Sequence, residues 1–244
     1  MKIAGRLPAL LLGALLLGAP LPAAAGAIGY GQGTQTDADG IPLGALDFDA
    51  QYRKYGAYAT TPDRSRIILT FDQGYENGYT DDILDVLAEK HVTAIFFLTG
   101  DYARKEPALI KRMIAEGHTL GNHGMTHACI AGMNSAAIEE ELMTLHSYVQ
   151  QQYGYDMQYF RPPCGEYDAF ALEKVKSLGY RTLFWSAAYE DWKTDDQPEP
   201  AAALGKLTDM VHGGAVYLLH SVSETNAKIL GSLIDALRAK GYTV

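Results

Sequence analysis

Short apolar runs alternate with helix-spaced segments from about residue 66 onward. The apolar runs suit buried strands, and in the segments between them apolar residues recur every three or four positions. This alternation is typical of a parallel α/β sheet or barrel. We therefore predict an α/β fold with six or seven strand–helix units. The expected strands cover residues 67–71, 93–99, 119–122, 159–161, 181–186 and 215–219.

The helix predicted over residues 135–152 shows the clearest pattern, with apolar positions at spacings of four, three and four. Ser135 is its expected capping residue, and the three glutamates in its first turns suit the positive end of the helix dipole. The other helix starts are also expected at residues that can cap a helix or favour its first turn. They are Thr80, Asp168 and Ser223.

The first 25 residues have the pattern of a secretory signal peptide. Lys2 and Arg6 precede an apolar run over residues 7–19, and small alanines follow it. This run is shorter than the roughly 20 residues that span a bilayer. An uncleaved anchor is the alternative, because no further charge appears until Asp37. We expect cleavage after Ala25, a secreted or cell-envelope location, and no stable membrane span in the mature chain.

Residues 26–65 show no sustained periodicity and are rich in Gly, Thr, Asp and Ala. This composition predicts a linker or a loosely packed lead-in arm ahead of one folded domain over residues 66–244. The alternation calls for one more strand where the sequence stops at Val244. We therefore expect the barrel to be either left open or clipped at its C-terminus.

The composition narrows the class of protein. With 48% hydrophobic residues among 244, the chain can bury a sizeable core, which excludes a disordered or fibrous protein. Its 20 Lys+Arg and 29 Asp+Glu give a formal net charge of −9 without a basic patch, so we expect no nucleic-acid partner. We expect a monomer.

The chain has two cysteines, Cys129 and Cys164. They are too few for a disulfide scaffold, and they lack the close spacing of a structural zinc site. Two alternatives remain open from the sequence, a single disulfide or two free thiols.

Polar residues follow five of the apolar segments. In parallel α/β folds the carboxyl ends of the strands meet at one face, where catalytic residues gather. Side chains from five segments are therefore expected to converge there. They are Asp72, His123, Arg161, Asp191 and His220.

Each of these residues has a plainer interpretation when it is taken alone. Asp72 could close an Asx-type turn, Arg161 could form a structural ion pair, and His220 could be a satisfied core histidine. The pair His123 and His127 is more informative, because two imidazoles four residues apart can converge on one metal ion.

Taken in order, the five segments resemble the motifs of the NodB-type polysaccharide deacetylases. Members of that family are metal-dependent enzymes that hydrolyse the N-acetyl group of an amino sugar, and their fold is an irregular (β/α) barrel of about seven units. A closer resemblance, to the delta-lactam-biosynthetic de-N-acetylases, rests on FDQGYENGYT at residues 71–80, YGAY at 55–58 and LLHSVS at 218–223. That subgroup deacetylates muramic acid in peptidoglycan on the route to the muramic delta-lactam of the spore cortex.

The resemblance implies how a metal and a general base would be held. His123, His127 and Gln73 would bind a divalent ion, with zinc favoured over manganese or cobalt. Asp72 would act as general base, and Arg161 would orient its carboxylate and keep its pKa low.

It also implies how the transition state and the leaving group would be stabilised. The backbone N–H of Cys164 would bind the oxyanion. His220 would protonate the leaving amine, with Asp191 sustaining its imidazolium form. Trp192 would form a wall of the same pocket.

Two alternatives to a muramic acid deacetylase remain. The first is a deacetylase of chitin oligomers or of peptidoglycan N-acetylglucosamine. The second, of a different class, is a non-catalytic carbohydrate-binding protein whose metal site is degraded, because the wider family has an aspartate where this chain has Gln73.

A carboxamide oxygen is a neutral and weaker metal ligand than a carboxylate, so Gln73→Asp should tighten metal binding. Isothermal titration calorimetry with zinc measures the difference. Equal zinc affinity of the two forms would contradict the prediction.

Overall fold

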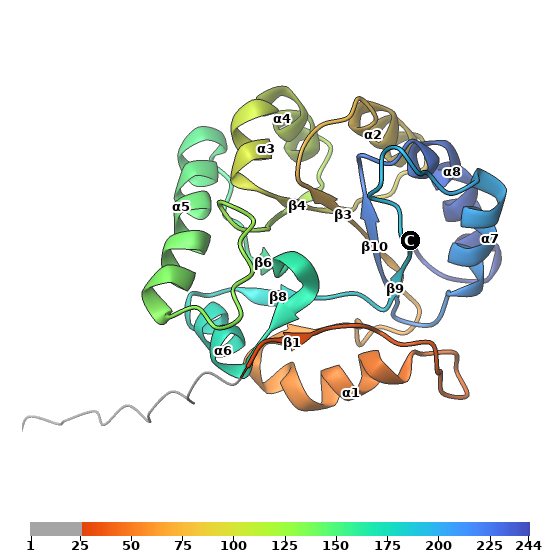
Figure 1. Cartoon of the computed structure of the whole chain (residues 1–244). Coiled ribbons are helices and arrows are strands. Elements are labelled where there is room, and N and C mark those ends of the chain that lie inside the picture. Colours follow the sequence, from red (N-terminus) through yellow and green to blue (C-terminus); the bar gives the residue numbers. More distant parts are fainter. Residues whose placement is uncertain (1–25) are drawn as a thin grey trace, which may run out of the picture.

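Eight parallel strands form one strongly curled sheet (Figure 1). The computed structural model describes residues 26–244, so the predicted signal peptide at residues 1–25 lies outside the described residues. The strand order across the sheet is β2 (Ala57–Tyr58), β8 (Arg181–Leu183), β6 (Tyr159–Phe160), β5 (Thr119–Asn122), β4 (Ile95–Leu98), β3 (Ile68–Gln73), β10 (Val216–His220) and β9 (Ala187–Ala188). All six predicted strands are present within a few residues of their expected bounds, and the α/β prediction is confirmed.

Residues 181–188 connect the two edges of this curled sheet. At one end of the segment, β8 pairs with both β6 and β2. At the other end, β9 pairs with β10, and the backbone N–H of Ser186 donates to the carbonyl of Val216 at 2.9 Å. One short stretch of chain therefore pairs with both arms of the sheet and gives it the form of an irregular barrel.

Helices surround the strands on the outside of the barrel (Figure 1). Every helix within residues 26–244 is too short or too polar to cross a bilayer. The helices are α1 (Leu43–Tyr52), α2 (Thr80–Glu89), α3 (Gly100–Lys105), α4 (Pro107–Ala115), α5 (Ser135–Tyr153), α6 (Ala169–Ser177), α7 (Pro200–Asp209) and α8 (Glu224–Ala239). Two 3-10 turns, η1 (Arg53–Tyr55) and η2 (Pro163–Gly165), and a small antiparallel pair of β1 (Ile28–Gly29) with β7 (Glu166–Tyr167) complete the fold.

Three of the predicted helix starts are held by side-chain caps. Asp168 accepts a hydrogen bond from the N–H of Ala171 and begins α6, and Ser223 begins α8 in the same way. For α5 the cap is Asn134, not Ser135 as expected, because the Asn134 side chain accepts from the N–H three residues ahead. Ser135 is instead the first helical residue.

Residues 26–65, expected to be a linker or a loosely packed arm, are instead built into the folded domain. Helix α1 buries Phe48 and Ala45 against Tyr167 and Phe184, and β2 forms an edge strand of the sheet. The buried carboxylate of Asp49 accepts the N–H of Ala59 at 2.6 Å, which joins α1 to the residues after β2. The apolar residues of the helix are spread around it, so its sequence carries no clear amphipathic stripe.

The last residues lie beside the start of β3. Thr243 forms a parallel bridge with Arg66 and donates its backbone N–H to the carbonyl of Ser65 at 2.9 Å. The strand expected after α8 is therefore present only as this bridge.

Phe48→Ala should lower the free energy of unfolding by about 3–5 kcal/mol, because Phe48 is 3% exposed and its removal leaves a cavity in an aromatic cluster. Denaturant unfolding followed by tryptophan fluorescence measures this loss. Leu43→Ala, on the same helix at 38% exposure, is the matched control and should change stability much less. Equal effects of the two substitutions would mean that α1 is not part of the core.

Candidate active site

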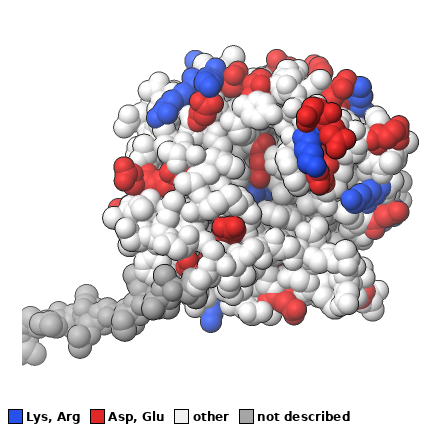
Figure 2. Space-filling model, viewed as in Figure 1, with Lys and Arg blue, Asp and Glu red and all other residues white. Residues whose placement is uncertain are grey.

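A cavity of about 470 Å³ opens where β3, β5 and β10 end. Figure 2 shows a hollow near the centre of this face, with acidic and basic groups visible inside it. Its position follows the rule that ligands bind beyond the carboxyl ends of parallel strands. Residues lining the cavity include Asp72, His123, His127, Trp192, His220, Tyr75 and Asp101.

Asp72 and Arg161 form a buried ion pair beneath this cavity. The Asp72 carboxylate accepts from a guanidinium nitrogen of Arg161 at 2.7 Å, and Arg161 is fully buried. Burial opposes ionisation of Asp72, but the positive charge of Arg161 outweighs it and holds the pKa of the carboxyl below its usual range. Asp72 is therefore a carboxylate at neutral pH.

His123 presents one free ring nitrogen to the same cavity. Its Nδ1 lies 2.8 Å from the backbone carbonyl of Arg161, which accepts a hydrogen bond only from a protonated nitrogen. The proton is thus on Nδ1, and the Nε2 lone pair faces Asp72 at 3.6 Å. Burial lowers the pKa of His123 to about 4, so the imidazole is neutral at physiological pH.

His127 lies in a loop whose backbone is held from beneath by Glu141 of α5. The Glu141 carboxylate accepts the N–H of Thr126 at 2.7 Å and that of Ala128 at 3.3 Å, the residues on either side of His127. The rings of His127 and His123 are 4.8 Å apart between centroids. Burial lowers the pKa of His127 as well, so both imidazoles favour the neutral form that binds metals.

Gln73 follows Asp72 at the end of β3 and is completely buried. Its Nε2 donates to the hydroxyl of Ser221, while its Oε1 has no hydrogen-bond partner among the described residues. An unpaired buried carbonyl oxygen is costly, and it is available to a cation.

His220 at the end of β10 is paired with the buried Asp191. Its Nδ1 and the Asp191 carboxylate are 2.7 Å apart, and the second carboxylate oxygen accepts the His220 backbone N–H at 2.8 Å and the side-chain amide of Asn226 at 2.6 Å. Burial alone would lower the pKa of His220, but the charge and hydrogen bond of Asp191 outweigh burial and raise it. Trp192 packs beside this imidazole with ring centroids 5.8 Å apart.

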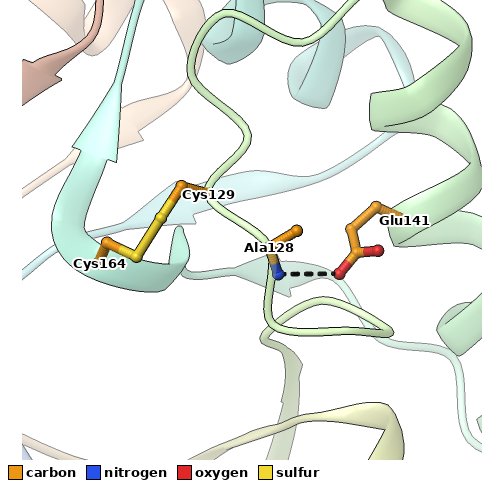
Figure 3. Close-up of a disulfide and its surroundings, with 4 residues drawn as sticks. All are labelled: Ala128, Cys129, Glu141 and Cys164. Atoms are coloured by element: carbon orange, nitrogen blue, oxygen red, sulfur yellow. Dashed lines mark hydrogen bonds between the residues drawn. A yellow bond between two sulfur atoms is a disulfide. The ribbon is translucent and has the colours of Figure 1, made fainter.

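Cys129 and Cys164 form a disulfide between two loops of this face, which settles the alternative left open by the sequence (Figure 3). Their Cα atoms are 6.0 Å apart. Cys164 itself follows the two prolines after Arg161 and has a left-handed backbone with φ of 63°.

The structure brings most of the expected site residues together. Asp72, His123, His127, Trp192 and His220 line one cavity. Two others touch these residues from behind, with Arg161 against Asp72 and Asp191 against His220. Gln73 is buried next to Asp72 in the chain, outside the cavity lining, with its amide on Ser221, the residue after His220. Among the described residues that line the cavity, Cys164 does not occur; the disulfide attaches it to the His127 loop.

Three supporting residues were not expected from the sequence. Thr70 accepts a hydrogen bond from Arg161 at 2.7 Å, Asn226 holds Asp191, and Glu141 holds the His127 loop. Glu141 belongs to the three glutamates assigned above to the helix dipole, but it is buried at 8% exposure. Its position four residues before Leu145 places it on the apolar stripe of α5, and this position was the sequence signal that Glu141 is buried.

The sequence profile described as polysaccharide deacetylase matches residues 59–183, a little over half of the chain. The chain belongs to the polysaccharide deacetylase family.

Several relatives of this deacetylase family resemble the chain over most of its length. The chain is 43% identical over 204 residues to the peptidoglycan-N-acetylmuramic acid deacetylase PdaA of Bacillus subtilis, covering 83% of this chain and 78% of the relative. It is 30% identical to a chitooligosaccharide deacetylase of Bradyrhizobium, covering 84% of this chain and 95% of that one.

The solved structure of Bacillus subtilis PdaA, a family 4 carbohydrate esterase, superposes with a TM-score of 0.83 at 38% identity, covering 89% of this chain and 93% of that chain. A family pseudoenzyme from Bacillus anthracis superposes with a TM-score of 0.72 at 25% identity, covering 77% of this chain and 66% of that one. The shared fold of this deacetylase family therefore accommodates both an enzyme and a protein without activity.

Asp191→Asn should lower the pKa of His220, because the substitution removes the negative charge that favours the imidazolium. Since a raised pKa keeps the ring protonated to higher pH, the variant ring should lose its proton at lower pH than the wild type. Titration of the ring proton resonances by NMR measures the shift. Asp195→Asn, an exposed position on the same loop, is the control and should leave the His220 titration unchanged. Identical titrations of all three proteins would contradict this account.

Proposed function

We propose that this protein is a metal-dependent N-deacetylase of peptidoglycan that removes the acetyl group of N-acetylmuramic acid. One observation carries the proposal: a carboxylate whose ionised form is favoured by Arg161 and an imidazole whose protonated form is favoured by Asp191 face the same cavity as two imidazoles that burial keeps neutral. Two titratable groups whose surroundings push their pKa values in opposite directions are the usual sign of an acid–base pair.

Donors in this cavity and directly beneath it fit a divalent cation. His123 offers the lone pair of Nε2, His127 is neutral and adjacent, and the Oε1 of Gln73 is a buried acceptor without a partner among the described residues. Zinc suits two imidazoles best, with manganese or cobalt as alternatives. When bound, the cation would polarise the acetyl oxygen and lower the pKa of a water molecule.

Asp72 is proposed to accept the proton of the attacking water, since its pKa is held low enough for it to be ionised. The water oxygen forms the new bond to the acetyl carbon. The backbone N–H of Cys164 is the proposed donor to the developing oxyanion.

His220 is proposed to give its proton to the departing nitrogen from Nε2, because Nδ1 is engaged with Asp191. The carbon–nitrogen bond then breaks, and the products are acetate and a free amine. Trp192, half exposed beside His220, is proposed to form the wall against which the sugar ring packs.

The proposed substrate and location follow from the relatives and from the disulfide. The similarity to a peptidoglycan-N-acetylmuramic acid deacetylase favours muramic acid, and the free amine formed there is the group needed for closure of the muramic delta-lactam of the spore cortex. A disulfide persists in oxidising surroundings, which supports a secreted or cell-envelope protein.

A second substrate, N-acetylglucosamine in peptidoglycan or in chitin oligomers, is favoured by one observation. None of the described residues that line the cavity is Lys or Arg, whereas a muramic acid without its peptide carries a free carboxylate. A neutral amino sugar carries no carboxylate and needs no positively charged side chain in the cavity.

Muropeptide analysis distinguishes the two substrates. Purified peptidoglycan would be incubated with the zinc-loaded protein, with and without a muramoyl amidase and with and without a chelator. We expect acetate loss on muramic acid only after the amidase has removed the peptide, and no loss with the chelator. Acetate loss on glucosamine would favour the second substrate. Glycan binding without acetate release with zinc, manganese or cobalt would instead indicate a carbohydrate-binding protein.

Asp72→Asn should lower kcat on the N-acetylated glycan by about 10²–10⁴-fold, since an amide cannot act as general base. Acetate release under saturating substrate measures kcat, and glycan binding should persist. Asp82→Asn, on the exposed face of α2, is the matched control and should retain the wild-type rate. Wild-type kcat in the Asp72 variant would overturn the assignment of the base.

A further inference from the structure

We propose that the Cys129–Cys164 disulfide is a positioning device for His127, and that its reduction weakens metal binding at the cavity. This inference rests on the proposed function, because it concerns the residues that would hold the cation. It assigns a role in the active site to the side chains of two cysteines that lie outside the cavity lining.

The backbone around His127 needs an external restraint. His127 has φ of 61°, in the left-handed backbone region that residues other than glycine adopt infrequently. Such a conformation persists only where surrounding contacts hold it in place. Its ring position depends directly on that backbone.

Glu141 and the disulfide both hold this loop, and Figure 3 shows the disulfide together with the bond from Ala128 to Glu141. On the N-terminal side of His127, Glu141 accepts the Thr126 N–H at 2.7 Å and also the Thr126 hydroxyl at 2.9 Å. On the C-terminal side, the bond from Ala128 to Glu141 is longer, at 3.3 Å. The covalent link at Cys129 therefore adds a restraint between Ala128 and the buried Ile130.

The far end of the disulfide is attached to a rigid part of the barrel. Cys164 follows Arg161 and two prolines, and Arg161 is fixed by hydrogen bonds to Asp72, Thr70 and the carbonyls of β8 and the residue after it. Each proline fixes its φ angle, so Cys164 has little freedom to move relative to the buried Arg161.

The two candidate metal-binding imidazoles are consequently oriented by the same short segment. His123 is held by its hydrogen bond to the Arg161 carbonyl, and His127 is held through Cys129 to Cys164, three residues further along. If the disulfide is cut, His123 keeps its anchor, whereas His127 loses one of its two restraints and is held by Glu141 alone. The distance between the two rings is then less firmly fixed.

The disulfide is open to a reducing agent, because Cys164 is exposed and Cys129 is only partly buried. A water-soluble trialkylphosphine is a suitable reductant. Its phosphorus is oxidised to the phosphine oxide with oxygen from water, and the disulfide gains two electrons and two protons to give two thiols.

The test compares wild type with a Cys129→Ser/Cys164→Ser variant, each with and without the phosphine. Zinc affinity is measured by calorimetry, kcat and KM are measured at saturating zinc, and backbone amide exchange is followed over residues 124–130. The reduced wild type needs no refolding, so the test does not depend on how well the variant folds.

We expect zinc affinity to fall by about 10–100-fold in the serine variant and in the reduced wild type, as for other groups that orient a metal ligand. Amides of residues 124–130 should exchange faster, and KM for the glycan should change by less than about twofold. The phosphine should have no further effect on the variant, which controls for chelation by the reagent.

Equal zinc affinity in the oxidised and reduced forms would overturn the inference, as would an effect confined to melting temperature. In either case an intact rate of acetate release would leave the proposed function standing. An oxidised wild type that binds no zinc and releases no acetate would overturn the proposed function, and this inference with it.

Discussion

The guanidinium of Arg161 is the group on which the geometry of the cavity depends. It is fully buried, bonded to the Asp72 carboxylate and the Thr70 hydroxyl of β3 and to the carbonyls of Leu183 and Phe184, and it lies 4.3 Å from the centroid of the Phe97 ring. A buried charge is tolerated only when its hydrogen-bonding groups are satisfied, and breaking such a pair typically costs about 3–5 kcal/mol. The strand ends that carry the chemistry are thus held together by a contact that is also essential for stability.

Two ion pairs determine which side chains around the cavity are charged. Arg161 stabilises the negative charge of Asp72, whereas Asp191 stabilises a positive charge on His220. Burial alone would favour the neutral form of both Asp72 and His220, and in each case the partner charge outweighs it. His123 has no such excess of negative charge, so burial prevails there and the ring stays neutral. The charge of the neighbouring group therefore decides which of these side chains is charged.

Much of the barrel and its chemistry could be predicted from the sequence, because strands buried on both sides are continuous apolar runs and polar residues stand at their ends. Helix α1 could not be predicted, because its apolar residues are spread around the helix and its buried face is defined only by packing in the folded chain. Glu141 and Asn226 were also missed, because each is an ordinary helix residue by sequence and its role depends on a loop that reaches it through the fold. The pairing of the cysteines likewise depends on distance in space, which spacing along the chain does not give.

The pairing of β3 with β10 has a consequence for how the chain acquires its chemistry. Asp72 and His220 are direct partners in that register, and the residues that follow them, Gln73 and Ser221, are 148 positions apart. Contacts so distant in sequence form slowly, because the entropy cost of closing a long loop comes before the favourable energy of the contact. During synthesis the ribosome makes Asp72, both imidazoles and Arg161 well before His220. A nascent chain can therefore already hold the base while the acid is still missing, and the complete pair exists only once the last long helix can cover β10.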